Sequence, residues 1–119
     1  MMGPLETLGQ VFLCREPVDL RKSIDGLAAL VEGTLGLDPF SAQLFVFTNR
    51  RRDKLKCLWW DRSGFCLWYK RLERERFHWP VHLAGAPIVL SGQQLRWLVE
   101  GYDLRHWRPH PTLAYKSVL

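Results

Sequence analysis

Apolar residues divide this chain into short stretches whose spacing is typical of strands. Residues 10–15 (QVFLCR) form a brief apolar run, and Gln43–Thr48 (QLFVFT) is the most strand-like segment of the sequence. Two further strands are predicted at Lys54–Trp60 and Phe65–Arg71. The DRSG sequence that joins them at 61–64 is a plausible hairpin turn, with a glycine available for positive φ. These segments predict a small sheet.

One helix is predicted between the first two strands. Asp19 can cap it, and Gly36 stands where a left-handed residue would end it. Its apolar stripe has helical spacing and consists of Leu20, Ile24, Leu27, Ala28, Val31 and Leu35. We therefore expect a helix over residues 20–35, packed against other parts of the protein.

The C-terminal part of the chain carries a second helix signal. Ser91 and Gln94 have the spacing of a capping box, and Gly101 marks the end of the apolar stripe that follows. Residues 81–89, which precede this helix and contain a glycine and a proline, are expected to be irregular or edge structure. Residues 104–119 hold two prolines and little periodicity, so they predict an extended tail.

Together these elements predict an α+β fold. It comprises a small antiparallel sheet of three to five strands, with an N-terminal strand, one packed helix after it and a C-terminal helix. At 119 residues, the chain is expected to be a single domain over 1–119, with a loose leader at 1–9. The leader lacks the basic and apolar regions of a secretory signal, and no apolar run is long enough to span a membrane. A cytoplasmic protein that has no membrane partner is predicted.

The predicted hairpin sorts its side chains onto two faces. If Asp61 lies opposite Gly64, cross-strand partners follow along both strands, and alternate residues point to opposite sides. The first face carries Leu55, Cys57, Trp59, Cys66 and Trp68, and we expect it to pack on the helix at 20–35. The second face carries Lys54, Lys56, Leu58, Trp60, Phe65, Leu67, Tyr69 and Arg71, and it is the candidate binding face. In the alternative interpretation, both faces are covered and Trp60, Phe65 and Leu67 form a second core.

Positive charge is concentrated on the same segment. The chain has a formal net charge of +5 at pH 7, whereas residues 50–76 alone hold ten Lys/Arg and four Asp/Glu, a net charge of +6. Localised positive charge beside aromatic side chains indicates a surface that binds polyanions. The predicted nucleic-acid-binding residues here are Arg50, Arg51, Arg52, Lys54, Lys56, Arg71, Arg74 and Arg76, with Trp60 and Tyr69 available for stacking.

A second candidate anion contact lies at the start of the predicted first helix. Arg21 and Lys22 fall in its first turn, where the helix dipole disfavours cations. An anion docked on the free N–H groups there would make this placement favourable. A solvated surface pair is the simpler interpretation, and both residues remain candidate nucleic-acid contacts.

Cysteine and histidine positions indicate no metal, cofactor or disulfide framework. The cysteines are odd in number and lack CxxC spacing, which predicts reduced, buried thiols at Cys14, Cys57 and Cys66. The histidines show no recognised ligand spacing; they are His78, His82, His106 and His110.

Catalytic motifs are likewise missing from the sequence. It contains no P-loop, GxSxG or HExxH motif. A metal-dependent nuclease needs clustered carboxylates, whereas the aspartates are scattered over predicted caps and turns. The chain is therefore not expected to be an enzyme. A small nuclease that depends on Asp53 or Asp61 is kept as an alternative.

Three long blocks of the sequence resemble a known family. They are DLRKSIDGLAALVE at 19–32, DPFSAQLFVFTNRRRDKLKCLWWDRSGFCLWYKRLERERFHWP at 38–80 and LSGQQLRWLVEGYDL at 90–104. The resemblance is to the accessory protein TnpB, the second open reading frame product of the insertion sequence 66 family of bacterial transposable elements. It implies a role in transposition beside a separate DDE-type transposase and a third small protein. It brings no catalytic motif that could be transferred to residues of this chain.

The resemblance and the charge pattern lead to one expected function. The protein should be an accessory factor of DNA transposition that binds the transposon end or the target through its basic aromatic hairpin. The alternative is a protein-interaction module that uses the same surface to bind the transposase without touching DNA, because Trp, Tyr and Arg are also enriched at protein interfaces.

Overall fold

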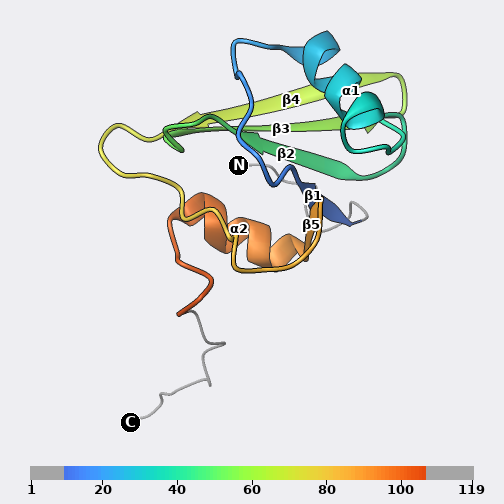
Figure 1. Ribbon diagram of the computed structural model, residues 1–119. Helices are drawn as coiled ribbons and strands as arrows, with labels where there is room; N and C mark the ends of the chain where they lie inside the picture. The colour runs from blue at the N-terminus through green and yellow to red at the C-terminus, as the bar shows by residue number, and fades with distance from the viewer. Residues whose placement is uncertain (1–9, 107–119) are drawn as a thin grey trace, which may run out of the picture.

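The computed structural model describes residues 10–106, which form a five-stranded sheet and two helices (Figure 1). In chain order the elements are β1 (Val11–Leu13), α1 (Ile24–Gly33), β2 (Leu44–Thr48), β3 (Lys54–Asp61), β4 (Gly64–Arg71), β5 (Ile88–Leu90) and α2 (Gly92–Glu100). The predicted leader at 1–9 and residues 107–119 of the predicted tail lie outside the described residues. Within 10–106, neither helix has the length and apolar character needed to cross a membrane.

The sheet has the strand order β4-β3-β2-β1-β5. Three of its four strand pairs are antiparallel, and β1 runs parallel to β2. The predicted α+β fold is confirmed, whereas the parallel pair was not predicted. It arises because α1 stands between β1 and β2 in the chain, and a helical crossover returns the chain to the same end of the sheet. Residues 88–89 of the stretch expected to be irregular or edge structure belong to β5, an edge strand.

The β3–β4 hairpin has the predicted register. Asp61 lies opposite Gly64, and the pairing continues to Lys54 opposite Arg71. The residue with positive φ in the turn is Arg62, at 54°, and not Gly64, which instead takes part in the strand ladder. The alternation of side chains along both strands is therefore as the sequence predicts.

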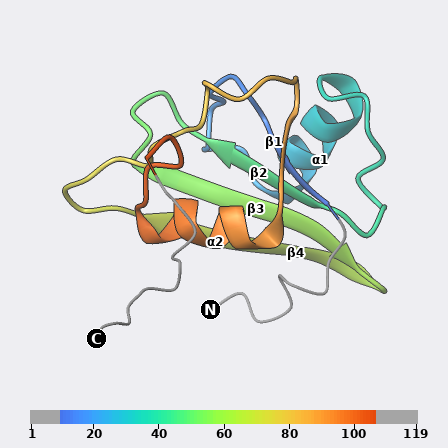
Figure 2. The same ribbon diagram turned by 90° about the horizontal axis from the view of Figure 1, so that it is seen from below.

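The two helices cover opposite faces of the sheet (Figures 1 and 2). β2 is buried along its whole length, so its residues contribute to both sides. Phe45 and Phe47 pack in a cluster with Leu27 and Val31 of α1. The opposite cluster joins the sheet to α2 and contains Leu44, Val46, Leu55, Cys57, Phe77, Trp79, Leu95 and Leu98 among others. The sheet is thus a central layer between two apolar clusters.

The expected partner of the first hairpin face was wrong. Leu55 and Cys57 pack in the cluster with α2, and Trp59 and Trp68 pack against that cluster, whereas α1 lies over the other face. The alternative interpretation, a sheet covered on both sides, is confirmed at Phe65 and Leu67, which pack against the α1-side cluster. Side-chain alternation indicates which residues share a face but does not indicate which helix covers it.

The first helix also begins later than the spacing predicts. It starts at Ile24 with Ser23 at the N-cap position, so it does not start at Leu20 with Asp19 as its cap. The Asp19 carboxylate instead accepts hydrogen bonds from the Arg21 backbone N–H at 3.0 Å and from its guanidinium at 2.7 Å. This local bonding favours a turn over a helix. Arg21 and Lys22 therefore precede the helix, and the argument from its dipole does not apply to them.

The signals at both ends of α2 are confirmed, and Gly101 is its left-handed C-cap, with a φ of 101°. The predicted end of the first helix was wrong, because α1 ends at Gly33 with Thr34 as a right-handed C-cap, and Gly36, with a φ of 66°, lies beyond it. Ser91 and Gln94 form both hydrogen bonds of the capping box. The predicted extended tail differs at its beginning, because residues 104–106 form a turn in which Asp103 accepts a hydrogen bond from the backbone N–H of Arg105 at 3.0 Å.

Candidate nucleic-acid interface

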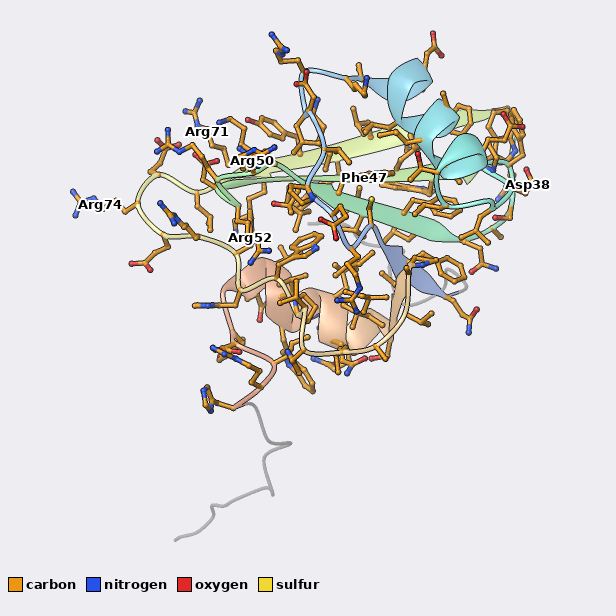
Figure 3. The ribbon with its side chains drawn as sticks, viewed as in Figure 1. Asp38, Phe47, Arg50, Arg52, Arg71 and Arg74 are labelled. Atoms are coloured by element: carbon orange, nitrogen blue, oxygen red, sulfur yellow. The ribbon has the colours of Figure 1, made fainter. Side chains whose placement is uncertain are left out.

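Most of the predicted cationic residues gather at one end of the sheet. They come from the β2–β3 turn, the open end of the hairpin and the segment that follows β4. Figure 3 shows Arg50, Arg52, Arg71 and Arg74 around this end, with Asp38 at the opposite end of the molecule. We call this region the basic end and define it by Arg50, Arg51, Arg52, Lys54, Lys56, Arg71, Arg74 and Arg76.

The β2–β3 turn is built around Asn49. Its side-chain oxygen accepts a hydrogen bond from the Lys54 backbone N–H at 3.1 Å, and its amide nitrogen donates to Asp53 Oδ1 at 2.7 Å. The second bond holds the pKa of Asp53 below its usual value. Arg52 has a φ of 60°, which lets the chain reverse tightly. The adjacent Arg50 side chain is left exposed to solvent.

The segment after β4 is fastened to this turn. The backbone N–H of Leu72 donates to the Asp53 carbonyl at 2.7 Å, and that of Phe77 donates to the Arg52 carbonyl at 2.7 Å. Phe77 is buried in the α2-side cluster, which anchors the segment further. Arg74 and Arg76, both exposed, are consequently carried at the same end of the sheet as the arginines of the turn.

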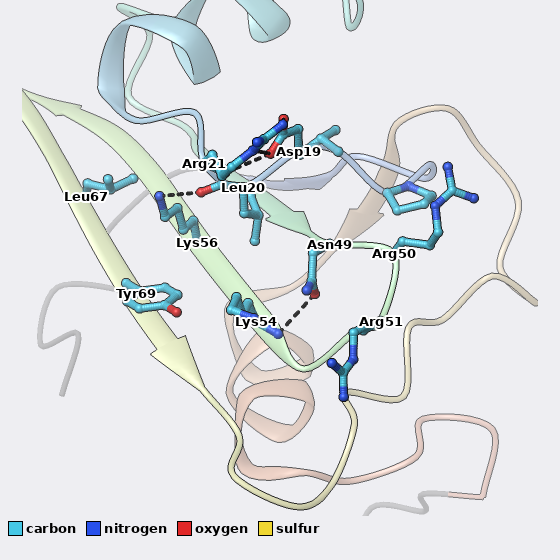
Figure 4. A pocket seen from close by; sticks show the side chains of 12 residues that line it. Asp19, Leu20, Arg21, Asn49, Arg50, Arg51, Lys54, Lys56, Leu67 and Tyr69 are labelled. Carbon is cyan, nitrogen blue, oxygen red and sulfur yellow. Dashed lines mark hydrogen bonds and ion pairs between the residues drawn. The ribbon is translucent and has the colours of Figure 1, made fainter.

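A cavity of about 950 Å³ opens at the basic end (Figure 4). One part of its lining is apolar and comprises Pro17, Val18, Leu20, Leu67 and the ring of Tyr69. The other part is cationic and comprises Arg50, Arg51, Lys54 and Lys56. The cavity exists because α1 begins only at residue 24 and leaves the open end of the hairpin uncovered. An apolar lining beside concentrated positive charge suits a ligand that combines a flat apolar group with an anion.

Lys56 holds one wall of the cavity in place. Its ammonium donates to the carbonyls of Leu20 at 2.8 Å and Lys22 at 2.9 Å, and it lies 5.6 Å from the centroid of the Tyr69 ring. The Val18 backbone N–H adds a hydrogen bond to the Thr48 carbonyl at 2.9 Å. The segment before α1 is therefore tied to β2 and β3, and the lysine charge stays beside the tyrosine.

The cationic residues differ in whether a neighbouring Asp or Glu side chain forms an ion pair with them. Arg71 lies 3.0 Å from Glu73, and Lys54 lies 3.6 Å from Asp53. Arg50, Arg51, Arg74 and Arg76 form no ion pair with any other residue in the range 10–106. Four guanidinium groups at one end are thus free of direct ion pairs with described residues, although Arg51 lies close enough to Asp53 to help lower the pKa of that carboxyl group.

Asp19 and Arg21 form a separate ion pair at the cavity rim. The guanidinium lies 2.7 Å from the carboxylate, and both side chains face solvent. Its hydrogen bonds lower the pKa of Asp19 from 3.8 to about 2, so the carboxylate is ionised at neutral pH. Arg21 lines the cavity, but its charge is already neutralised by this pair. Lys22 contributes its backbone carbonyl to the bond from Lys56.

The structure separates the two aromatic residues that were predicted to stack on a ligand. Tyr69 lines the cavity at the basic end. Trp60 lies near the closed end of the hairpin, where its ring is 5.1 Å from Phe40 and 5.0 Å from Phe65, centroid to centroid. Edge-to-face packing of this kind is typical of structural aromatic clusters. Only Tyr69 is brought together with the predicted cations.

Several residues that shape the cavity were not predicted from the sequence. Pro17 and Val18 were given no role, Leu20 was assigned to the apolar stripe of the first helix, and Leu67 was placed on the candidate face or in a second core. Asn49 could have been found, since an asparagine between a strand and a run of arginines is a typical turn signal.

The carboxylates of the nuclease alternative are not brought together. Asp53 immediately precedes β3 and Asp61 ends it, so about eight residues of extended chain, roughly 27 Å, separate them. Across residues 10–106, no group of three or more His, Cys, Asp or Glu side chains is placed to hold a metal ion. His110 lies outside the described residues.

The three cysteines are free thiols. Cys14 and Cys57 are buried as predicted, and burial raises the pKa of both. Cys66 is only partly buried. The thiols of the two buried cysteines therefore remain protonated at neutral pH.

These features define a small α+β protein with a basic, partly apolar cavity at one end of its sheet. Residues 9–109 match the family described as "IS66 Orf2 like protein". The chain belongs to this family, whose members are accessory proteins of transposition and are not known enzymes.

Two relatives from Sinorhizobium fredii (strain NBRC 101917 / NGR234) resemble the chain over most of its length. The first, named "Uncharacterized protein y4hO", is 41% identical over 104 residues, which cover 84% of this chain and 90% of the relative. The second, named "Uncharacterized protein y4jC", is 39% identical over 112 residues, which cover 94% of each chain. No solved structure matches the chain.

Proposed function

We propose that the protein supports transposition by binding DNA through phosphate contacts at its basic end. The observation that carries this proposal is that Arg50, Arg51, Arg74 and Arg76, from two segments tied together at this end, form no ion pair with a described residue. A DNA backbone presents closely spaced negative charges, and binding releases the counterions condensed on it. The DNA would be a transposon end or the target.

The two segments that carry the arginines are rigidly attached to each other. This supports the interpretation that the arginines bind a ligand and do not merely keep the protein soluble. The turn that carries Arg50 and Arg51 is tied internally through Asn49, and the segment that carries Arg74 and Arg76 is tied to the same turn. Because the two backbones are fixed relative to each other, less conformational freedom is lost when both bind one phosphate chain. Arg71 and Lys54 extend the same surface along the hairpin.

Fluorescence anisotropy with labelled DNA tests this proposal. Affinity for a transposon-end oligonucleotide and a scrambled one is measured at several salt concentrations with the wild type, Arg50→Glu/Arg51→Glu and Arg62→Glu. Arg62→Glu is the matched control, because it reverses an exposed charge at the closed end of the same hairpin. Arg50→Glu/Arg51→Glu should weaken binding by at least about tenfold and reduce the slope of log affinity against log salt by about two.

The possible results of this experiment distinguish a local DNA-binding site from a general charge effect and from no DNA binding. An equal loss of affinity in Arg50→Glu/Arg51→Glu and Arg62→Glu would show a general charge effect and would contradict a local site. Undetectable binding at low salt, or a salt slope near zero, would refute DNA binding by this protein. A scrambled oligonucleotide bound as tightly as the transposon end is compatible with the proposal, because phosphate contacts carry no sequence information.

A second candidate function is docking on the transposase through the free edge of β4. This eight-residue strand ends the sheet and pairs only with β3 among the described residues. A long unpaired edge can accept a strand from another protein. Retention of purified transposase on immobilised protein, in high salt and after nuclease treatment, would favour this function. If the transposase is no longer retained under those conditions, the association of the two proteins would depend on DNA.

A further inference from the structure

Tyr69 is exposed near the open end of the hairpin. It is 47% exposed, although its neighbours Leu67 and Lys56 are partly buried. Tyr69 pairs with Lys56 across the hairpin, and the two side chains share the face that borders the cavity. Figure 4 shows the Tyr69 ring and Leu67 on one side of the cavity and Lys54 with Arg51 on another. An open aromatic ring is thus held next to cations.

The two parts of the cavity lining match the two parts of a nucleotide. Leu67, Val18, Leu20 and the Tyr69 ring suit a flat, largely apolar base, whereas Arg50, Arg51 and Lys54 suit a phosphate. The volume of about 950 Å³ lies within the usual range for small-molecule sites. A surface that binds only the phosphates of DNA does not require an apolar wall. The wall therefore indicates contact with a base as well as with the phosphate backbone of the nucleic acid.

An intact duplex cannot use this wall. Its bases are paired and stacked, and only their edges are accessible in the grooves. An unpaired nucleotide can turn its base outward onto an aromatic ring, and every base has a face that can stack. A site with such a wall would therefore favour a nucleic acid that has a free base.

We propose that the cavity receives an unpaired nucleotide of single-stranded DNA, with the base against Tyr69 and Leu67 and the phosphate against Arg50, Arg51 and Lys54. The inference rests on the proposed DNA binding and deepens it, because it predicts that a strand with free bases is preferred over blunt duplex. Lys56 maintains the site, since its bonds to the Leu20 and Lys22 carbonyls keep the apolar wall in position.

The test compares three labelled DNA probes and three tyrosine variants of the full chain. The probes are a single strand of about 15 nucleotides, its blunt duplex, and the duplex with a short single-stranded overhang. The variants are Tyr69→Ala, Tyr69→Phe and Tyr102→Ala. The last is the matched control, because Tyr102 is 50% exposed and lies outside the cavity.

The expected result is a selective effect of removing the ring. The wild type should bind the single strand and the overhang more tightly than the blunt duplex. Tyr69→Ala should weaken single-strand binding by about tenfold and leave duplex binding unchanged, and Tyr69→Phe should retain most of the affinity. Irradiation of a strand that contains 5-iodouracil should crosslink it to Tyr69, identified by mass spectrometry.

The same measurements separate failure of this inference from failure of the proposed function. If Tyr69→Ala binds both probes as the wild type does, or weakens both equally, the inference is overturned. DNA binding itself would still stand, provided that Arg50→Glu/Arg51→Glu weakens affinity. If the wild type binds none of the three probes at low salt, both proposals fall. Crosslinking only to residues outside the cavity would also overturn the placement of the base.

Discussion

The two ends of the β3–β4 hairpin share the same strands and the same sheet face, yet they have opposite character. At the closed end, Trp60 and Phe65 are covered by each other and by Phe40. At the open end, Tyr69 and Lys56 border a cavity. Cross-strand pairing is continuous between the two ends, so backbone geometry does not account for the difference.

The difference follows from what lies above each end. α1 and the segment that follows it supply apolar side chains over the hairpin near its turn, including Phe40. Among residues 10–106, the short segment before α1 lies over the open end, and Lys56 holds it in place. Where the helix and the loop after it cover the hairpin, its aromatic residues pack on one another; where they do not, a ring and cations remain available to a ligand. Composition alone therefore does not identify the binding residues of this hairpin.

The largest expected effect comes from removing a ring at the closed end. Trp60→Ala should lower the free energy of unfolding by about 2–3 kcal/mol, because it removes contacts with two other rings and leaves a partly buried void. Tyr69→Ala, on the same face at the open end, should cost less than about 1 kcal/mol. Urea denaturation followed by circular dichroism measures both. Equal destabilisation by the two substitutions would contradict the distinction between the ends.

The next effect concerns the lysine that keeps the cavity open. Lys56→Met removes the hydrogen bonds to the Leu20 and Lys22 carbonyls but keeps a long apolar side chain, so unfolding should become easier by about 1–2 kcal/mol. Amide hydrogen exchange of Val18 should accelerate relative to that of the sheet centre. Lys54→Met is the matched control and should leave Val18 exchange unchanged. Unaltered Val18 exchange in Lys56→Met would show that the segment is held by other contacts.

A smaller effect is expected from an exposed cation at the open end. Arg71→Ala should leave the urea midpoint unchanged, because its ion pair with Glu73 is solvent-exposed. It should reduce the salt slope of DNA affinity by about one if Arg71 contacts a phosphate. Arg62→Ala at the closed end should alter neither quantity. A shifted urea midpoint for Arg71→Ala would mean that the residue is structural.

The smallest effect is the titration of Asp19 at the cavity rim. Hydrogen bonds from Arg21 lower the pKa of Asp19 from 3.8 to about 2 in the folded protein. Because the folded pKa is below the unfolded one, the stabilising contribution of this pair is complete above about pH 4 and is lost as the pH falls through 2. Carboxyl carbon NMR should show a midpoint near 2 that returns toward 3.8 in Arg21→Ala. An unshifted midpoint in that variant would contradict the assigned cause.

Features that depend on neighbouring residues were predictable in detail. The hairpin register follows from the position of its turn, and the capping box and Gly101 mark the limits of α2. The concentration of positive charge on residues 50–76 is visible without any structure. Among the exceptions is the start of α1, because Asp19 had two available local roles and the structure uses it in a turn with Arg21. The end of α1 and the positive-φ residue of the hairpin turn also differ from the prediction.

What the sequence by itself determined is therefore the set of elements, the side chains that share each hairpin face and the segment that carries the charge. Only the tertiary structure decided that α2 covers the first face, that α1 covers half of the second, and that a cavity remains beside Tyr69. The physical reason is the range of the interactions. Pairing and capping join residues close in the chain, whereas covering a sheet face depends on where a distant segment can bury its own apolar side chains.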